Sequence, residues 1–397
     1  MSTIRVKNVG PIRDTGLIEL RRVMVLIGQQ SSGKSTLMKI LCFCRWLEKS
    51  IMIDEAKVKW YTSYKRFVKE LKSFHRLDDS FFSSDSEICY RGTSMSIEWQ
   101  GRGNQNARIT LSANYAERRH NSKLCFIPSE RNLVAAIQNI DKAYKSSELD
   151  LIFNFIFEWD EARRKFGTST QLPLSVAQGV GYFYQRGKDY IYLKERQRKL
   201  STLYASSGIQ SALPIEAMVD YYSAQVGELP KLSLSEVREF LYKSTGDTPS
   251  QASLLQYASV QFFIEEPELN LFPSSQRDLV LKLLCRFHQI TEVERSSSML
   301  VMTTHSPYIL SMLNMVLAVA RAIEQKPHLT SQIEEHLGLG TCPLKTQDYA
   351  AYFINTDGTL SDLVDRELPM ISGVELDGVS DWVDDGISYI NELLYGE

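Results

Sequence analysis

Nine consecutive residues near the start of the chain have the types and spacing of a loop that binds phosphate. They are Gly28, Gln29, Gln30, Ser31, Ser32, Gly33, Lys34, Ser35 and Thr36. The glycines allow backbone N–H groups to curl around an anion, and a helix that begins here adds free N–H groups and the positive end of its dipole. Lys34 would reach the β- and γ-phosphates of a nucleotide, and Ser35 would bind Mg²⁺.

Two later apolar segments end in polar residues that would act on such a ligand. Glu265 and Glu266 follow residues 260–264, and His305 comes shortly after residues 298–303. Ligands of open α/β sheets bind at the carboxyl ends of the strands, so both places are expected beside the phosphate loop. Glu265 would hold Mg²⁺ directly or through water, and Glu266 would orient or activate the attacking water. His305 could hydrogen-bond the γ-phosphate or that water.

A further motif, Ser206, Ser207 and Gly208, precedes an apolar helix predicted over residues 212–222. Small residues, hydroxyl groups and a glycine at the start of a helix can form a second anion-binding loop. Ser-Ser-Gly is also common in ordinary loops, so this motif taken alone is less specific than the others.

The elements expected to position these motifs alternate between strand and helix. Apolar runs typical of buried parallel strands cover residues 23–27, 260–264, 298–303 and 350–354, and helices are predicted over residues 275–288 and 306–321. This alternation favours a mostly parallel α/β sheet. Other patterns fill the middle of the chain: a helix rich in lysine and aromatic residues over 57–75, a β-hairpin over 94–112 and a helix over 146–166.

We expect four parts along the chain. Residues 1–50 form an N-terminal lobe with the phosphate loop, and residues 51–200 form an insertion or arm with helices and a β-hairpin, including a core strand near residues 124–127. Residues 201–370 form a C-terminal lobe that carries the other motifs, and residues 371–397 form a helical tail.

Composition and charge exclude several classes of protein. The chain has 397 residues, 43% of them apolar, with 45 Lys and Arg against 48 Asp and Glu, a formal net charge of −3. These values exclude a wholly disordered, a collagen-like or a disulfide-stabilised miniature protein. The six cysteines contain no C-x-x-C pair, and we expect reduced, buried thiols. No signal peptide or membrane span is apparent, so a soluble cytoplasmic protein without a membrane partner is expected.

In their order, the motifs resemble those of ATPases of the ATP-binding-cassette (ABC) class, in the SMC/RecF/OLD branch. The similarity is to bacterial defence-associated AAA family ATPases with an interrupted cassette and no Toprim domain. It covers residues 1–45 and 200–370, including the run from Glu266 to Pro273, and the separate stretch 126–132 also resembles a family feature. The resemblance implies a P-loop NTPase of ABC-ATPase type, with a mixed or mostly parallel sheet, helices and a largely helical insertion.

The resemblance also implies roles for the motifs. Residues 28–36 are then the Walker A loop, 206–208 the signature loop, Glu265 and Glu266 the Walker B pair and His305 the switch histidine. Three features depart from the family pattern: Glu265 replaces the usual aspartate, Ser207 and Ile209 differ from the usual signature, and no Q-loop glutamine can be placed, residues 129–131 being the nearest candidate.

A mechanism and an assembly follow from the family. Two chains would pair head to tail, so that each ATP lies between residues 28–36 of one chain and residues 206–208 of the other. The expected assembly is a homodimer, or a higher homo-oligomer built from dimers, with ATP and Mg²⁺ as ligands.

Four uses of the ATPase activity are consistent with these motifs. The first is a sensor or regulatory subunit of a bacterial anti-phage or toxin–antitoxin-like module, working with a separately encoded nuclease or toxin. The second is a RecF-like DNA repair or maintenance ATPase. DNA could meet basic stretches at residues 65–66, 118–120, 163–165 and 196–199, although interleaved acidic residues also fit solvated helix faces.

The other two uses are less consistent with the sequence. An OLD-type nuclease would need a Toprim domain, and the roughly fifty residues after Thr341 are too few for one. A transporter cassette is disfavoured by the long insertion and by the Glu-Pro-Glu run at residues 266–268.

Overall fold

The computed structural model describes residues 2–137, 150–228, 256–293, 298–340, 344–365 and 370–372. A six-stranded sheet with the order β16-β15-β4-β14-β13-β8 forms its centre, and five of the six strands are parallel. The antiparallel strand is β16 at the edge. The strands are β4 (Val23–Gly28), β8 (Asn121–Ile127), β13 (Tyr257–Glu265), β14 (Met299–Thr304), β15 (Tyr349–Ile354) and β16 (Leu360–Asp362).

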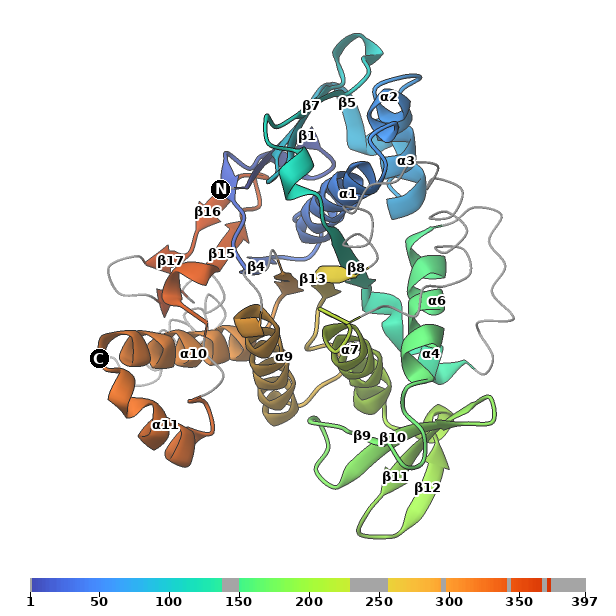
Figure 1. The fold of residues 1–397 in the computed structure, drawn as a ribbon, viewed down its shortest axis with the longest axis vertical. Helices are drawn as coiled ribbons and strands as arrows, with labels where there is room; N and C mark the ends of the chain where they lie inside the picture. The colour runs from blue at the N-terminus through green and yellow to red at the C-terminus, as the bar shows by residue number, and fades with distance from the viewer. Residues whose placement is uncertain are drawn as a thin grey trace, which may run out of the picture.

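Both faces of this sheet are covered, which explains why its strands are apolar without alternation (Figure 1). Val23, Val25 and Ile27 of β4 pack into a core with four helices on one face, whereas Met24 and Leu26 pack into a second core with α1 on the other face. The helices are α1 (Lys34–Ile53), α6 (Leu151–Arg163), α7 (Ser207–Ser223), α9 (Pro273–Val293) and α10 (Pro307–Gln325).

A second, antiparallel sheet joins the N-terminal strands to the middle of the chain. Its order is β2-β1-β5-β6-β7, with β3 also paired to β1. The hairpin expected over residues 94–112 forms as β6 and β7. The strands are β1 (Thr3–Val9), β2 (Ile12–Asp14), β3 (Ile18–Glu19), β5 (Phe82–Arg91), β6 (Met95–Gln100) and β7 (Arg108–Leu111).

The middle of the chain contains more strands than a largely helical insertion would. Besides β5 to β8, it contributes the sheet β12-β11-β10-β9 near the end of α6 (Figure 1). These strands are β9 (Leu172–Pro173), β10 (Val180–Gln185), β11 (Lys188–Leu193) and β12 (Arg198–Ser201). The sequence of residues 189–193 predicts a short strand, which forms as part of β11, but its hairpin with β10 was not predicted, because Tyr side chains fall on both faces and weaken the alternation.

The helices of this region are shorter than expected. The helix predicted over residues 57–75 divides into α2 (Lys57–Tyr61) and α3 (Arg66–His75), because Tyr64 and Lys65 adopt left-handed backbone conformations that end a helical run. The remaining short elements are α4 (Leu133–Ala136), α11 (Thr330–Leu337), β17 (Val364–Asp365) and β18 (Met370–Ile371). The tail predicted as helical lies outside the described residues, apart from its first two, which belong to the end of β18 and the residue after it.

Two expectations need correction, namely that no segment is long and apolar enough to span a membrane and that all cysteines are reduced. Within the described residues α10 is long and apolar enough to cross a membrane, a test that no segment was expected to pass. Its residues Ile309, Leu313 and Leu317 are nevertheless buried in the core, as in any core helix. Four cysteines are free, as expected, namely Cys42, Cys44, Cys89 and Cys125, but Cys285 is disulfide-bonded.

Candidate functional site

The motifs meet at one edge of the central sheet because its parallel strands end in register. Gly28 pairs with Ile354, Ile27 with Thr304, and Thr303 with Glu265 on the next strand. The carboxyl ends of β4, β14 and β13 are therefore neighbours, although up to 276 residues separate them in the chain. This is where ligands bind in open α/β sheets.

The phosphate loop requires its glycines. Gly28 and Gly33 have φ values of 152° and 110°, which L side chains rarely adopt. A Cβ at Gly28 would lie 2.7 Å from the main-chain oxygen of Ile354, and one at Gly33 would lie 2.9 Å from Ile12 Cγ1. Gly33 caps α1, so the loop leads directly into the free N–H groups of a 20-residue helix.

Lys34 lies folded over this loop. Its Nζ donates hydrogen bonds to the main-chain oxygens of Gly28 at 2.9 Å and Gln29 at 2.6 Å. Burial lowers the pKa of Lys34 to about 8, although the carboxylates of Glu266 and Glu268 act in the opposite direction. The ammonium group thus carries a charge at neutral pH in a desolvated place, as an anion-binding group should.

The other loop residues differ in accessibility. Gln29 and Ser31 are exposed, Ser35 is half-buried, and Ser32 and Thr36 are buried. The hydroxyl oxygen of Ser32 is buried without a hydrogen-bond partner among the described residues. An unsatisfied hydroxyl inside a loop of this shape suits a phosphate oxygen as its partner.

Glu265 ends β13 with a carboxylate that is only partly satisfied. Its Oε2 accepts the backbone N–H of Ser129 at 3.1 Å, whereas Oε1 is buried without a hydrogen-bond partner in the described part of the chain. Burial raises the pKa of Glu265, and Lys39, the Ser35 hydroxyl and the Ser129 N–H oppose this shift. The two residues predicted to hold Mg²⁺, Ser35 and Glu265, are therefore neighbours.

These donors fit Mg²⁺ as a companion of a nucleotide. The described residues contain no group of three or more His, Cys, Asp or Glu side chains that could hold a metal ion. Mg²⁺ commonly binds through one or two carboxylate or hydroxyl ligands, with water and substrate phosphates as the remaining ligands. Ser35 and Glu265 would supply that set.

Glu266 and His305 face each other across adjacent strand ends. Glu266 Oε1 lies 3.4 Å from His305 Nε2, and both side chains are 31% exposed. Glu266 has a φ of 43°, a strained conformation for a residue with a side chain. Its N–H donates to the main-chain oxygen of Thr303 at 3.0 Å, which holds this conformation.

Two residues that had no assigned role complete this part of the site. Glu268 Oε1 accepts hydrogen bonds from Thr304 Oγ1 at 2.8 Å and from the backbone N–H of His305 at 2.7 Å. Arg131 is fully buried, and within the described residues it donates to main-chain oxygens alone, so it does not present its charge to a ligand. The second carboxylate of the Glu-Pro-Glu run and the polar residues after β8 were the available sequence signals.

The signature-like motif begins α7. Ser206 is the N-cap, and its Oγ accepts the N–H of Ile209 at 3.4 Å. Ser206 and Ser207 are exposed, and none of the hydrogen bonds that the described residues give 206–208 reaches residues 28–36 of the same chain. A Cβ at Gly208 would lie 2.9 Å from the main-chain oxygen of Asn270, so this glycine allows α7 to approach the turn after Glu266.

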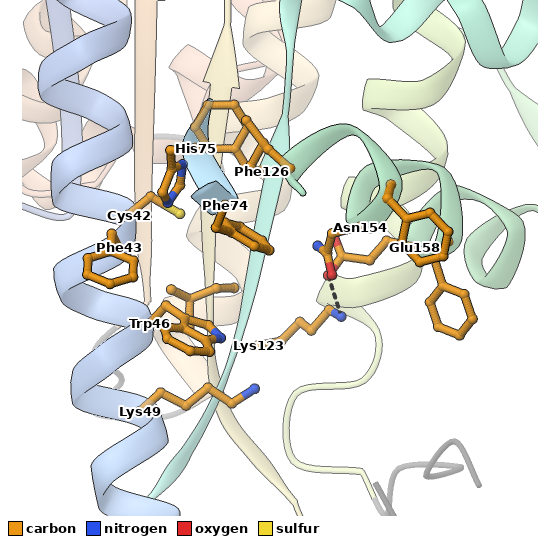
Figure 2. A pocket seen from close by; sticks show the side chains of 14 residues that line it. Cys42, Phe43, Trp46, Lys49, Phe74, His75, Lys123, Phe126, Asn154 and Glu158 are labelled. Carbon is orange, nitrogen blue, oxygen red and sulfur yellow. Dashed lines mark ion pairs between the residues drawn. The ribbon is translucent and has the colours of Figure 1, made fainter. Parts of the chain in front are cut away.

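A separate pocket of about 470 Å³ opens between α1, α3, β8 and α6 (Figure 2). Figure 2 shows aromatic rings around it and an ion pair in which Lys123 Nζ lies 2.7 Å from Glu158 Oε1. Burial lowers the pKa of His75 to about 3, so its imidazole is neutral. None of the sequence-predicted site residues is among the fourteen residues that line this pocket.

No protein-family model matches this chain, and no curated protein matches it either. Among solved structures, the SMC head domain from Thermotoga maritima is 11% identical, with a TM-score of 0.35, over 78% of this chain and 90% of that one. An SmcHead bound to the C-winged helix domain of ScpA is 9% identical, with a TM-score of 0.40, over 92% of this chain and 98% of that one.

The fold class rests on the strand order and the loop geometry rather than on these distant similarities. A mostly parallel sheet with the phosphate loop between β4 and α1, helices on both faces and an antiparallel sheet built on β1 is an α/β fold of the P-loop kind. The α/β fold class expected from the sequence is confirmed, with the correction that the described part of residues 51–200 is not largely helical, because strands make up about as much of it as helices.

Proposed function

We propose that this chain is an ATPase that binds ATP with Mg²⁺ and cleaves the γ-phosphate by attack of water. One juxtaposition supports this activity above all: the Glu266 and His305 side chains, 3.4 Å apart, stand at the sheet edge where the phosphate loop begins. A carboxylate and an imidazole beside a phosphate loop are the groups that hydrolysis requires.

Each side chain then has a defined task. Lys34 would exchange the main-chain oxygens of Gly28 and Gln29 for β- and γ-phosphate oxygens. Ser35 and Glu265 would hold Mg²⁺, which when bound neutralises charge on the phosphates. Because Glu266 is partly exposed, its carboxylate can accept a hydrogen bond from the attacking water and orient it.

His305 is placed to act on the same water or on the γ-phosphate. Its backbone N–H is fixed by Glu268, so the imidazole starts from a defined position. With Nε2 protonated, the ring donates a hydrogen bond toward negative charge that develops at the phosphoryl group.

We propose further that two chains enclose the nucleotides. The exposed Ser206 and Ser207 have no partner in residues 28–36 of their own chain within the described residues, and the start of α7 offers free N–H groups. In a head-to-tail homodimer, residues 206–208 of each chain would close over the other chain's nucleotide, and twofold symmetry satisfies both contacts at once. Higher homo-oligomers would be built from such dimers.

For the cellular role, we propose a sensor or regulatory subunit of a bacterial anti-phage or toxin–antitoxin-like module. The resemblance of the motifs to the interrupted cassettes of defence ATPases supports this role. ATP would favour the closed dimer and hydrolysis would release it, and this two-state change would control a separately encoded nuclease or toxin.

The test combines three proteins. ATP binding, phosphate release and molar mass by light scattering are measured for the wild type, Lys34→Ala and Glu266→Gln. We expect Lys34→Ala to lose ATP binding, and Glu266→Gln to bind ATP, lose hydrolysis and double its mass when ATP and Mg²⁺ are added. Normal hydrolysis by Glu266→Gln would refute the assignment of Glu266, and a mass that ATP leaves unchanged would refute the ATP-dependent dimer.

A DNA repair or maintenance ATPase is the second candidate. The segment from Lys57 to Lys72 contains six basic residues and one acidic residue, and it exposes the rings of Trp60 and Tyr64. The Arg66 guanidinium lies 3.3 Å from the centroid of the Trp60 ring. Basic and aromatic side chains together suit a nucleic-acid backbone and its bases. DNA binding that weakens steeply with salt and strengthens with ATP would favour this role, and co-purification of an effector protein would favour the first.

A further inference from the structure

Arg131 joins three separate parts of the chain through one buried guanidinium group. Its Nε donates to the main-chain oxygen of Ser211 in the second turn of α7 at 2.9 Å. Its Nη1 donates to the main-chain oxygens of Glu265 at 2.6 Å and Pro128 at 3.2 Å, and Nη2 donates to that of Glu266 at 2.7 Å. The planar fork of an arginine can satisfy these acceptors together, whereas a lysine ammonium is a single point.

Burying the charged guanidinium group of Arg131 costs folding free energy. This cost is understandable if the positions of the carbonyl groups that it binds matter for function. Arg131 is 0% exposed, and each of its hydrogen bonds in the described residues goes to a main-chain oxygen rather than a carboxylate. Burial lowers its pKa to about 10, so the group remains charged at neutral pH. The nearby carboxylates of Glu268, Glu266, Glu265 and Glu130 favour its charged form, while its direct hydrogen bonds go to main-chain dipoles of the acidic strand end, of Pro128 and of α7.

One of the residues that Arg131 holds by its carbonyl group is Glu266, whose backbone conformation is strained. Glu266 keeps its φ of 43° between the Thr303 oxygen, which accepts its N–H, and Arg131, which donates to its carbonyl group. A change at either side would rotate the peptide plane and move the carboxylate that faces His305.

α7 contacts the same turn by a second route. Asn270 Nδ2 donates to Ser211 Oγ at 3.0 Å. Gly208 also lies against the main-chain oxygen of Asn270, because a Cβ at Gly208 would be only 2.9 Å from it. A shift of the start of α7 would therefore displace both Arg131 and the turn after Glu266.

We propose that Arg131 is a positioning residue that couples the place of α7 to the orientation of Glu266 in the same chain. The inference rests on the proposed function. In the head-to-tail dimer, residues 206–208 at the start of α7 would contact the nucleotide of the other chain. Through Arg131, this contact would change the orientation of the Glu266 carboxylate in the chain to which α7 belongs. Hydrolysis at the two sites would then be cooperative.

The test measures hydrolysis as a function of ATP concentration for the wild type, Arg131→Lys and Thr303→Val. Thr303→Val is the matched control, because it removes only the 3.3 Å contact of Thr303 Oγ1 with the Glu266 N–H and does not touch α7. We expect Arg131→Lys to lower kcat about tenfold, to change ATP affinity little and to reduce the Hill coefficient from near 2 to 1. Thr303→Val should lower kcat while it keeps the Hill coefficient of the wild type.

The alternative outcomes are distinguishable. A wild type that neither hydrolyses ATP nor dimerises with it refutes the proposed function. A wild type that is active and cooperative, together with an equally cooperative Arg131→Lys, overturns the role of Arg131 alone. Should Arg131→Lys fail to fold by circular dichroism, hydrogen exchange of residues 265–271 is compared with and without ATP in the wild type and in Ser207→Arg, which blocks the head-to-tail contact. An ATP-dependent change of the same size in both proteins overturns the coupling of α7 to the turn after Glu266.

Discussion

The carboxylate of Glu268 accepts the backbone N–H of His305 across 2.7 Å, and it also accepts the hydroxyl group of Thr304. Glu268 therefore fixes the residue that faces Glu266, and its charge also acts on Lys34 of the phosphate loop. Burial raises the pKa of Glu268, and the His305 N–H and Thr304 hydroxyl oppose that shift by stabilising the charged form.

Replacing Glu268 tests whether this residue contributes to hydrolysis by positioning His305. We expect Glu268→Ala to leave the His305 N–H and the Thr304 hydroxyl unsatisfied, which costs about 1–3 kcal/mol of unfolding free energy, and to lower kcat by about tenfold or more. Glu268→Gln keeps an acceptor oxygen and should retain more of both. Urea unfolding and phosphate release measure the two effects, and equal activity in Glu268→Ala and the wild type would rule out this role.

The pKa of Lys34, about 8 against 10.5 for an ordinary lysine, predicts two effects of pH. Between these values the unfolded chain binds the proton and the folded chain does not, so this group makes the folded state more stable as pH rises from about 8 to 10.5. The ammonium charge of the nucleotide-free protein declines over the same range, so ATP affinity should fall above pH 8.

Lys34→Arg is the control for this pH dependence, because the guanidinium group keeps its charge throughout the range. Isothermal titration with ATP at pH 7, 8 and 9 gives the affinities, and chemical denaturation without nucleotide gives the stabilities. A wild-type affinity that does not change over this range, in buffers where Lys34→Arg is also constant, would contradict the low pKa of Lys34.

Ser207 tests whether the start of α7 acts on a second chain. Ser207 is exposed, so Ser207→Arg should leave the fold and ATP binding intact while the bulky side chain blocks the head-to-tail contact. We expect the ATP-dependent gain in mass to disappear and hydrolysis to fall by about tenfold or more. Ser311→Arg, at an exposed position of α10, controls for the added charge. Hydrolysis that survives Ser207→Arg at the wild-type rate would mean that residues 206–208 do not complete the site.

Local sequence patterns were sufficient to predict several features of the structure. Residues 28–36 form a phosphate loop with two glycines in strained conformations, and the apolar runs at 23–27, 260–264 and 298–303 are central strands. The reason is that these features depend on neighbours in the chain: a glycine must stand where φ is positive, and a strand covered on both faces must be apolar throughout.

The tertiary structure decided those contacts between distant residues that no motif predicted. Arg131 binds Ser211 and Glu266, 80 and 135 residues away, and β1 pairs with β5 across more than 70 residues. The backbone oxygens that satisfy Arg131 carry no sequence signal, because every residue has one. The long range of these contacts also explains why β5 was not predicted, whereas the local hairpin of β6 and β7 was: residues 82–91 pair with β1, and such a distant partner cannot be identified from periodicity.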